Sequence, residues 1–328
     1  MRKIIVLDDE GLGSEPLGWE ALAELGETRQ YRQTPRELVA GRIGENEIVL
    51  TNKAVIDRAI MDACPGMKYI GVLSTRYNVV DIEAAQERGI VVTNIPAYST
   101  YAVVQHSIAL LLEVCNHVHL HHEAVKAGRW ENSPKYCFWE KPLIELAHKT
   151  MGILGLGAIG QGMARAAQAL GMQVIAHTRT PKSLPGVQEV SLEELMARSD
   201  VLSIHCPLTQ QTEGMIAKEQ IALMREGAIL INTASGKIVR EEDILAALEE
   251  GRLGFYLADV MASEPPCKGD RLAHHERSIL TPHLAWSPIE TRRRLVEIAV
   301  SNVREYLRGN IQNSVIPQQN LAMAKNDK

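Results

Sequence analysis

The amino-acid sequence predicts an α/β protein with two doubly wound parallel-sheet domains, the second inserted into the first. Short apolar runs alternate with stretches of helical periodicity, an order typical of parallel sheets covered by helices on both faces. The alternation occurs in two series, and the second begins at Thr150. The chain has 328 residues, which exceeds one modest core and suits two domains of ordinary size.

The first series provides strands and helices in alternation. Asp57 and Asp81 are among the acidic residues that mark the starts of its helical segments. We expect strands at 4–7, 47–50, 69–73 and 90–94 and helices at 35–41, 55–64 and 81–88. One long helix, rich in Ala, Leu and Val, is expected at 101–127, and an irregular segment with aromatic residues follows at 128–142.

The second series is longer and ends in a strongly amphipathic helix at 294–307. We expect its strands within 150–157, 173–178, 201–207, 228–234, 255–261 and 278–286, and its helices at 158–170, 192–198, 217–225 and 241–250. The segment INTASG (231–236) ends one of these strands in small residues, and such strand ends line the crevice where ligands bind to parallel sheets.

Composition and charge restrict the class of partner. Apolar residues make up 45% and charged residues 23%, a normal globular balance, and the formal charge is −5. Nothing in this balance favours nucleic acid or an anionic membrane. The first apolar run stops at Asp8, so we expect a strand there rather than a signal peptide, and no run reaches membrane-spanning length. Five scattered cysteines without a CxxC pair predict reduced thiols in a cytoplasmic protein.

A glycine-rich loop indicates dinucleotide binding. The segment GILGLGAIGQG follows a predicted strand and opens an Ala-rich helix, with Gly155, Gly157 and Gly160 in G-x-G-x-x-G spacing. The first glycine permits the tight turn, the second lets the backbone approach a pyrophosphate, and the third lets helix and strand pack closely. The helix start, at Ala158 and Ile159, would attract the phosphate charge.

The end of the next strand bears on the choice between NADP and NAD. About 20 residues after the glycine loop, an NAD enzyme usually places Asp or Glu against the ribose hydroxyls. The sequence there is HTRTPK, with Thr178 in place of the acid and with Arg179 and Thr180 following. Positive charge and hydroxyl donors suit a 2′-phosphate, so we favour NADP. In the other interpretation, Arg179 and Lys182 are solvated surface charges and the cofactor is NAD.

Several motifs spread over nearly the whole chain indicate one family. They are KYIGVLSTRYNVVDIEAAQERGIVVTNIPAYST (68–100), the glycine loop, HCPLTQQTEGMI (205–216), ADVMASEPP (258–266) and TPHLAWSP (281–288). In these motifs the sequence resembles the D-2-hydroxyacid dehydrogenase family, and within it the glycerate dehydrogenase/hydroxypyruvate (glyoxylate) reductase group. The resemblance implies hydride transfer between a nicotinamide cofactor and a small 2-oxo or D-2-hydroxy acid.

The resemblance also implies a division into domains. Both ends of the chain, residues 1–99 and 288–328, would build a flavodoxin-like substrate domain, and residues 100–287 would form a Rossmann dinucleotide-binding domain. Two long linking helices would form the hinge and much of a homodimer contact. The aromatic stretch KYCFW (135–139) would lie near the active-site mouth, with ordinary interface packing as the equal alternative.

The same motifs imply the catalytic pair and much of the cofactor site. His283 would be the acid that supplies a proton to the carbonyl oxygen, and the base in the oxidative direction. Glu264 would be its partner, because a carboxylate bonded to an imidazole favours the protonated form. The remaining cofactor-binding positions are His205, Pro207, Thr212, Thr233, Ala234, Asp259 and Ala285, with His283 itself.

Two positions depart from the family pattern. The loop that normally carries N-T-x-R-G has Ser235 where the family places the arginine that grips the substrate carboxylate. The predicted substrate-binding segment Ser74, Thr75, Arg76 and Tyr77 has an arginine where the family usually has glycine. In one hypothesis Arg76 takes over anion binding and Ser235 makes room; in the other the two changes are unrelated and activity has decayed.

Three functions remain open from the sequence. The leading one is an NAD(P)-dependent reductase of a hydroxypyruvate- or glyoxylate-like acid. The second is a dinucleotide-binding sensor that has lost catalysis, and the third is a dehydrogenase for an atypical anionic substrate such as a phosphonate or sulfonate. We expect no metal site: His117 and His121 lie one helical turn apart, but such a cluster is more often the polar end of a helix.

Overall fold

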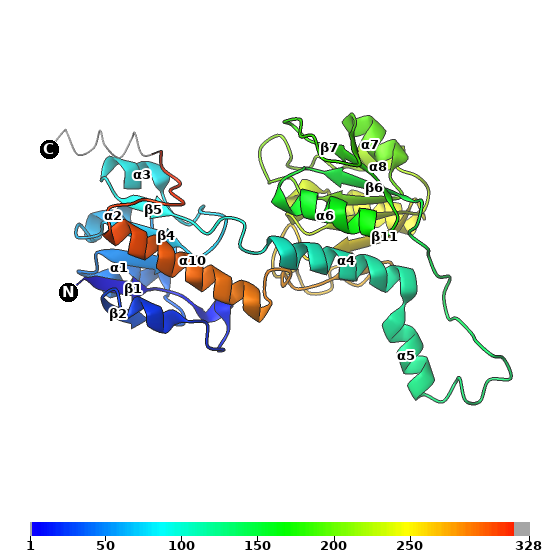
Figure 1. The fold of residues 1–328 in the computed structure, drawn as a ribbon, viewed down its shortest axis with the longest axis horizontal. Coiled ribbons are helices and arrows are strands. Elements are labelled where there is room, and N and C mark those ends of the chain that lie inside the picture. Colours follow the sequence, from blue (N-terminus) through cyan, green and yellow to red (C-terminus); the bar gives the residue numbers. More distant parts are fainter. Residues whose placement is uncertain (1, 318–328) are drawn as a thin grey trace. The chain divides into compact units, whose positions relative to one another are not determined.

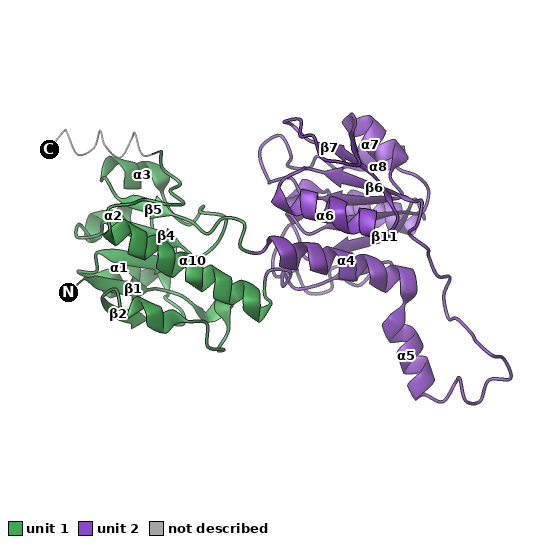
Figure 2. Cartoon of the chain, viewed as in Figure 1, with its two compact units in different colours: residues 1–98, 287–328 green, residues 99–286 purple. Residues whose placement is uncertain are grey.

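Two compact units make up the chain in the computed structural model, which describes residues 2–317. One unit combines residues 1–98 with 287–328, and the other comprises residues 99–286 (Figure 2). We call them unit 1 and unit 2. Residues 318–328, which are expected in the substrate domain, lie outside the described residues.

Unit 1 is built on a five-stranded parallel sheet in the order β2-β1-β3-β4-β5 (Figure 1). Its strands are β1 (Lys3–Val6), β2 (Glu27–Gln30), β3 (Ile48–Thr51), β4 (Tyr69–Val72) and β5 (Val91–Thr93). The order 2-1-3-4-5 is that of flavodoxin-like folds. Strand β2 was not expected from the sequence, because ETRQ is a mostly exposed polar strand at the edge of the sheet and no apolar run marks it.

Helices accompany this sheet, and two of them begin at aspartate caps. They are α1 (Val39–Ile43), α2 (Arg58–Ala63), α3 (Ile82–Glu87) and α10 (Ile289–Leu307), with 3₁₀ turns η1 (Glu10–Leu12), η2 (Trp19–Leu22) and η3 (Arg36–Leu38). The Asp57 and Asp81 carboxylates accept the backbone N–H three residues further on, at 3.1 and 2.9 Å. The two aspartates therefore cap α2 and α3, in agreement with their predicted role.

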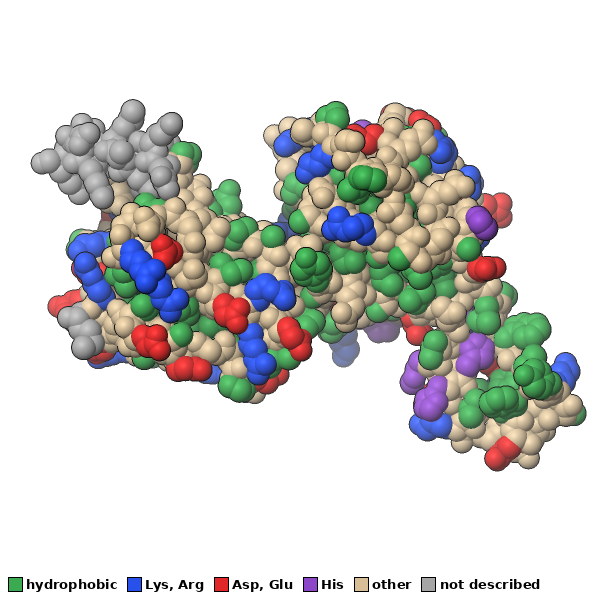
Figure 3. All heavy atoms as spheres, in the orientation of Figure 1, with side chains coloured by type: hydrophobic (Ala, Val, Ile, Leu, Met, Phe, Trp, Pro, Cys, Tyr) green, Lys and Arg blue, Asp and Glu red, His purple; other side chains and the backbone are tan. Residues whose placement is uncertain are grey.

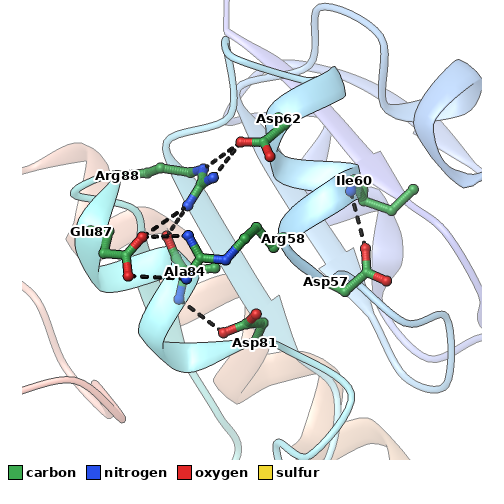
Figure 4. A network of polar contacts seen from close by, with 8 residues as sticks. All are labelled: Asp57, Arg58, Ile60, Asp62, Asp81, Ala84, Glu87 and Arg88. Atoms are coloured by element: carbon green, nitrogen blue, oxygen red, sulfur yellow. Dashed lines mark hydrogen bonds and ion pairs between the residues drawn. The ribbon is translucent and has the colours of Figure 1, made fainter.

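Ion pairs connect α2 and α3 on the surface of unit 1 (Figure 4). Arg58 at the start of α2 binds both carboxylate oxygens of Glu87 at the end of α3. Arg88 binds Asp62 of α2 and also donates to the carbonyl of Ala84, at 2.9 Å. We call these four charged residues, Arg58, Asp62, Glu87 and Arg88, the α2–α3 ion-pair network.

Unit 2 contains a seven-stranded parallel sheet in the order β12-β11-β10-β9-β6-β7-β8. Its strands are β6 (Thr150–Leu154), β7 (Gln173–His177), β8 (Val187–Glu189), β9 (Val201–Ile204), β10 (Ala228–Asn232), β11 (Leu253–Ala258) and β12 (Ser278–Leu280). Numbered from β6, the order contains the 3-2-1-4-5-6 arrangement of Rossmann folds. Together with unit 1, this confirms the predicted fold class of two doubly wound parallel-sheet domains.

The core of unit 2 lies on both faces of its sheet. Along β10, Ala228 and Leu230 join one apolar cluster, whereas Ile229 and Ile231 join another. Successive side chains of a strand point to opposite faces, so each cluster covers one face. The helices that supply these clusters are α4 (Thr100–Asn116), α6 (Ala158–Ala169), α7 (Leu192–Arg198), α8 (Lys218–Leu223) and α9 (Glu241–Glu249), with the 3₁₀ turn η4 (Gly236–Ile238).

The single long helix predicted at 101–127 is wrong. The structure has two helices, α4 and α5 (Val118–Lys126), separated at His117, whose backbone is left-handed with φ 47° and ψ 44°. The His117 N–H still bonds to the carbonyl of Glu113 at 2.8 Å, which closes α4 before the chain changes direction. Helical periodicity continues through the break, so the sequence pattern gave no sign of the break.

Among residues 2–317, no helix is long and apolar enough to cross a membrane.

Candidate active site

The carboxyl ends of the strands of unit 2 bring most of the predicted site residues to one edge of the sheet. Parallel strands all point the same way, so the loops that leave them meet at that edge. Gly155 to Gly160 follow β6, and Thr178, Arg179 and Thr180 follow β7; His205, Pro207 and Thr212 follow β9; Thr233, Ala234 and Ser235 follow β10; Asp259 and Glu264 follow β11; His283 and Ala285 follow β12.

The glycine loop has the geometry that a bound dinucleotide requires. Gly155 has φ +99°, and a Cβ on it would lie 2.7 Å from the backbone nitrogen of Cys206. A Cβ on Gly160 would lie 2.0 Å from the carbonyl oxygen of Gly155. Gly157 caps α6 and has open space, since a Cβ there would meet nothing within 4 Å. The first N–H groups of a helix lack intrahelical partners, so the open cradle and these donors fit a pyrophosphate.

The loop after β7 returns to the glycine loop. The ammonium of Lys182 donates to the carbonyl of Leu156, between the first two glycines, at 3.1 Å, and Gln161 donates to the same carbonyl at 3.1 Å. Thr178 is partly buried, whereas Arg179 and Thr180 are exposed. Lys182 is thus a positively charged neighbour of the glycine loop. The sequence shows the charge of Lys182, but it gives no sign of this contact with a residue 26 positions away.

His205 is a partly buried neutral group beside the glycine loop. Its backbone N–H bonds to the carbonyl of Leu154 at 2.8 Å, and its Nε2 is 2.8 Å from the hydroxyl of Ser203. Loss of hydration lowers the pKa of His205 to about 4, so the ring is uncharged near neutrality. Thr212 closes the following turn by donating to the carbonyl of Pro207 at 2.7 Å.

The loop that carries Ser235 is organised by Asn232. The buried Asn232 side chain accepts from the N–H of Ala234 at 3.1 Å and donates to the carbonyl of Ser235 at 2.9 Å. Ser235 is itself buried, with 7% of its surface exposed and an extended backbone. A Cβ on Gly236 would lie 1.9 Å from the carbonyl carbon of Met261, so only glycine lets this loop approach the loop after β11.

His283 and Glu264 form the predicted hydrogen-bonded pair. The Nδ1 atom of His283 is 2.6 Å from Oε2 of Glu264, and the other carboxylate oxygen accepts the N–H of Met261 at 3.0 Å. Both side chains are partly exposed, at 47% and 38%. A carboxylate only accepts, so Nδ1 carries a proton and Nε2 is the atom free to gain or lose one. The pair can therefore exchange a proton with a bound molecule through Nε2.

Asp259 holds the loop that carries His283. It is buried, with 2% of its surface exposed, and its carboxylate accepts the N–H groups of Leu284 and Ala285 at 2.9 and 2.8 Å. It also accepts the hydroxyl of Thr281 at 2.5 Å. These contacts lie on both sides of His283, whose φ of +51° is uncommon for a residue other than glycine. We call residues 281–285 the His283 loop.

The predicted substrate-binding residues Ser74, Thr75, Arg76 and Tyr77 lie in unit 1, directly after β4. The Thr75 hydroxyl donates to the carbonyl of Ile95 at 3.1 Å, and the Thr75 carbonyl accepts from Asn94 at 2.8 Å. The side chain of Arg76 is exposed, and Tyr77 is 42% exposed. The segment is therefore anchored through the hydroxyl and the carbonyl of Thr75, at the carboxyl edge of the five-stranded sheet.

Three residues that organise the site were missed from the sequence. Asn232 and Thr281 stand within the motifs, but their residue types give no sign of which groups they bond. His106 of α4 has its Nε2 2.9 Å from the Thr281 hydroxyl, although 175 positions separate the two residues.

His117 and His121 are joined through Nδ1 of His121 and the His117 carbonyl, at 2.8 Å. Within residues 2–317, no three His, Cys, Asp or Glu side chains are grouped so as to hold a metal ion.

Comparison with known proteins adds family-level similarity to this geometry. Residues 108–285, more than half of the chain, match the family model of the D-isomer specific 2-hydroxyacid dehydrogenase, NAD binding domain. The chain is 45% identical to hydroxypyruvate reductase of Blautia hydrogenotrophica over 95% of this chain and 99% of that protein. It is 35% identical to glycerate dehydrogenase of Methylorubrum extorquens over 96% and 99%. The NADPH-dependent glyoxylate/hydroxypyruvate reductase of Sinorhizobium meliloti, solved with citrate, superposes with a TM-score of 0.84 at 27% identity over 96% and 98%.

Proposed function

Because the chain belongs to the D-isomer specific 2-hydroxyacid dehydrogenase family and is an NAD(P)-dependent enzyme of that class, we propose that it interconverts a small 2-oxo acid and its D-2-hydroxy acid. Relatives named hydroxypyruvate reductase, glycerate dehydrogenase and glyoxylate reductase support a substrate of hydroxypyruvate or glyoxylate type. The observation that carries the proposal is the His283–Glu264 pair at the same sheet edge as the glycine loop.

His283 would act as the acid in reduction and as the base in oxidation. Glu264 keeps a proton on Nδ1, so Nε2 delivers its proton to the substrate oxygen as negative charge develops there. The Met261 N–H holds the second oxygen of Glu264 and so fixes the direction of the carboxylate. Asp259 would hold the His283 loop in place through its bonds to Leu284 and Ala285.

The dinucleotide would lie along the carboxyl edge of the seven-stranded sheet. The backbone from Gly157 to Gly160 would hold its pyrophosphate, and when bound the nicotinamide supplies the hydride. His205 and Ala285 would line the site without adding charge. We propose NADP as the preferred form, because Thr178 replaces the acid that would repel a 2′-phosphate and because Arg179, Thr180 and Lys182 add positive charge and donors.

A screen of cofactor oxidation tests the proposed activity. NADPH and NADH oxidation would be measured with glyoxylate, hydroxypyruvate, pyruvate and phosphonate analogues. We expect turnover with hydroxypyruvate or glyoxylate, faster with NADPH, and a loss of about 10²–10⁴-fold in kcat for His283→Gln. Intact NADPH binding without turnover of any acid would instead support a sensor, the alternative that Ser235 favours because the gripping arginine is missing. Turnover of the analogues alone would identify an atypical anionic substrate.

We propose further that Arg76 supplies the positive charge for the substrate carboxylate that Ser235 cannot supply. A charge-assisted hydrogen bond contributes roughly 1.5–3 kcal/mol, which is about tenfold to a hundredfold in affinity. Arg76→Gly should raise KM for the 2-oxo acid by that factor, and adding Ser235→Arg should restore part of it. Unchanged KM and kcat in Arg76→Gly would contradict this assignment.

A homodimer is the proposed assembly, formed through residues 118–143, which we call the arm. In Figure 1 α5 and the segment that follows it extend away from the sheet of unit 2. The arm exposes Tyr136, Trp139 and Trp130 at 93%, 66% and 53%, and apolar side chains gather there in Figure 3. Exposed apolar clusters of this kind mark interaction sites. Sedimentation equilibrium should show a dimer that Trp139→Ser weakens and that the control Leu223→Ser, outside the arm, does not; a wild-type monomer would contradict the proposal.

A further inference from the structure

The geometry of unit 2 points to a residue outside the motifs quoted above that positions the acid–base group. We propose that His106 of α4 is a positioning residue that acts on His283 through Thr281 and Asp259. This inference rests on the proposed role of His283. Its support is the chain of hydrogen bonds among three partly or fully buried side chains.

The direction of these bonds follows from the number of protons that Thr281 has to give. Its hydroxyl has one hydrogen, and the carboxylate of Asp259, at 2.5 Å, is the strongest acceptor near it. The hydroxyl oxygen is then an acceptor toward the Nε2 of His106, at 2.9 Å. His106 must therefore carry its proton on Nε2 and donate to Thr281. The hydrogen bonds run from His106 to Thr281 and from Thr281 to Asp259.

Burial strengthens this arrangement. Asp259 is 2% exposed, and the side chain of His106 is 18% exposed. Nε2 of His106 also lies 3.6 Å from Oδ1 of Asp259, so a positive imidazolium would face the carboxylate directly. Little water reaches these atoms, so the loss of one donor is not replaced by solvent at no cost.

These hydrogen bonds reach the His283 loop. The oxygen of Asp259 that accepts from Thr281 is also the oxygen that accepts the N–H of Leu284, the residue after His283, at 2.9 Å. On the other side, the His283 N–H bonds to the Thr281 carbonyl at 2.9 Å. Thr281 and Asp259 thus define both ends of the left-handed backbone at His283, and His106 defines the rotamer of Thr281. A small displacement of an acid–base group can cost about a hundredfold in rate.

Matched variants of His106 separate a positioning role from simple packing. His106→Gln keeps a donor nitrogen near the position of Nε2, whereas His106→Leu keeps bulk and removes the donor. We expect kcat to fall about tenfold or more in His106→Leu, with KM for the 2-oxo acid and the Kd for NADPH within about twofold, and His106→Gln to recover most of the loss. Thr281→Val should resemble His106→Leu, and the double variant should be no worse than either one. Equal losses in both His106 variants, or full activity in His106→Leu, would overturn the proposal.

A second measurement is independent of turnover. The imidazole signals of ¹³C-labelled protein can be followed by NMR, with the His283 signal identified by its absence in His283→Asn. We expect His106→Leu to shift or broaden that signal and His106→Gln to leave it near its wild-type position. If the wild-type protein turns over no 2-oxo acid, the proposed function fails while this experiment still decides the role of His106. An unmoved His283 signal in His106→Leu rejects that role.

Discussion

Charged side chains join neighbouring segments in two regions of this protein, and they do so in opposite ways. In unit 2, the single buried carboxylate of Asp259 accepts three donors from the His283 loop. In unit 1, the α2–α3 ion-pair network joins two helices through pairs of opposite charges, with Glu87 and Asp62 exposed at 58% and 60% (Figure 4). Water competes for every bond of the network and for almost none of those at Asp259. We therefore expect burial, more than the number of ion pairs, to determine how strongly a charged side chain stabilises the segments it joins.

Asp259→Ala should have the largest effect. It leaves two backbone N–H groups and one hydroxyl without their acceptor inside the protein, and each such group costs about 1–3 kcal/mol. We expect the free energy of unfolding to fall by roughly 3 kcal/mol or more and kcat to fall with it. Urea denaturation and steady-state kinetics measure the two quantities.

Asp62→Ala is the matched control in the exposed network. It also removes one carboxylate that receives an arginine, but in water, and should cost at most about 1 kcal/mol. If Asp259→Ala and Asp62→Ala have equal effects on unfolding, burial does not govern the difference between the two regions.

The dependence of stability on pH should also differ between the partly buried His205 and the exposed charges. Its pKa is lowered from 6.5 to about 4 by loss of hydration. Between these two pH values His205 is therefore protonated in the unfolded chain but not in the folded chain. The contribution of His205 to the free energy of unfolding is therefore fully present above pH 6.5. It is lost as the pH falls toward 4, by up to roughly 3 kcal/mol. Unfolding free energies of the cofactor-free protein between pH 7 and pH 4 should show this slope, and His205→Asn should remove it.

The exposed network has a different pH window. Arg58 lowers the pKa of Glu87 from its ordinary value of 4.5, mainly through their hydrogen bond. The contribution of Glu87 is therefore present above pH 4.5 and is lost only as the pH falls below it. A loss of stability that begins below pH 4.5 in the wild-type protein, with none between pH 6.5 and 4.5, would contradict the assignment to His205.

Backbone contact offers a smaller test of the same contrast. A Cβ on Gly236 would lie 1.9 Å from the Met261 carbonyl carbon, in a buried contact between two loops of the site. Gly236→Ala should therefore cost about 1–3 kcal/mol, as overpacking does, and should disturb the loop that leads to Glu264. At the exposed Gly66 an added Cβ meets nothing within 4 Å, so Gly66→Ala is the control and should be nearly neutral. Thermal unfolding of both variants decides between a packed and a tolerant loop contact.

The sequence predicted those parts of the molecule that local pattern encodes. The glycine loop and the His283–Glu264 pair stand within short motifs, and the alternation of apolar runs indicated both sheets. The edge strand β2 lacked an apolar run, and the break at His117 depends on a single backbone conformation within a continuous helical pattern. Neither the strand nor the break can therefore be predicted from the pattern of apolar residues.

Contacts between distant residues could not be read in the same way. His106 meets Thr281 because α4 packs on β10 and β11, and nothing around His106 in the sequence specifies its partner. The charge of Lys182 was noticed, but its contact with Leu156 depends on the path of the loop after β7. Motifs therefore identify the groups that can do chemistry, whereas the residues that hold those groups are found from the packing.

The smallest effect is expected in the network itself. Arg58 and Glu87 make two hydrogen bonds on the surface, with side chains exposed at 47% and 58%, so their coupling free energy should be small. A double-mutant cycle with Arg58→Ala and Glu87→Ala, measured by urea denaturation, isolates this term. Because mobile ions screen exposed charges, the coupling should nearly vanish in 1 M NaCl, where the screening length is about 3 Å. A coupling that is as large as the effect of Asp259→Ala and persists in 1 M NaCl would mean that the network behaves like a buried cluster. The contrast with Asp259 would then have to rest on geometry rather than on exposure.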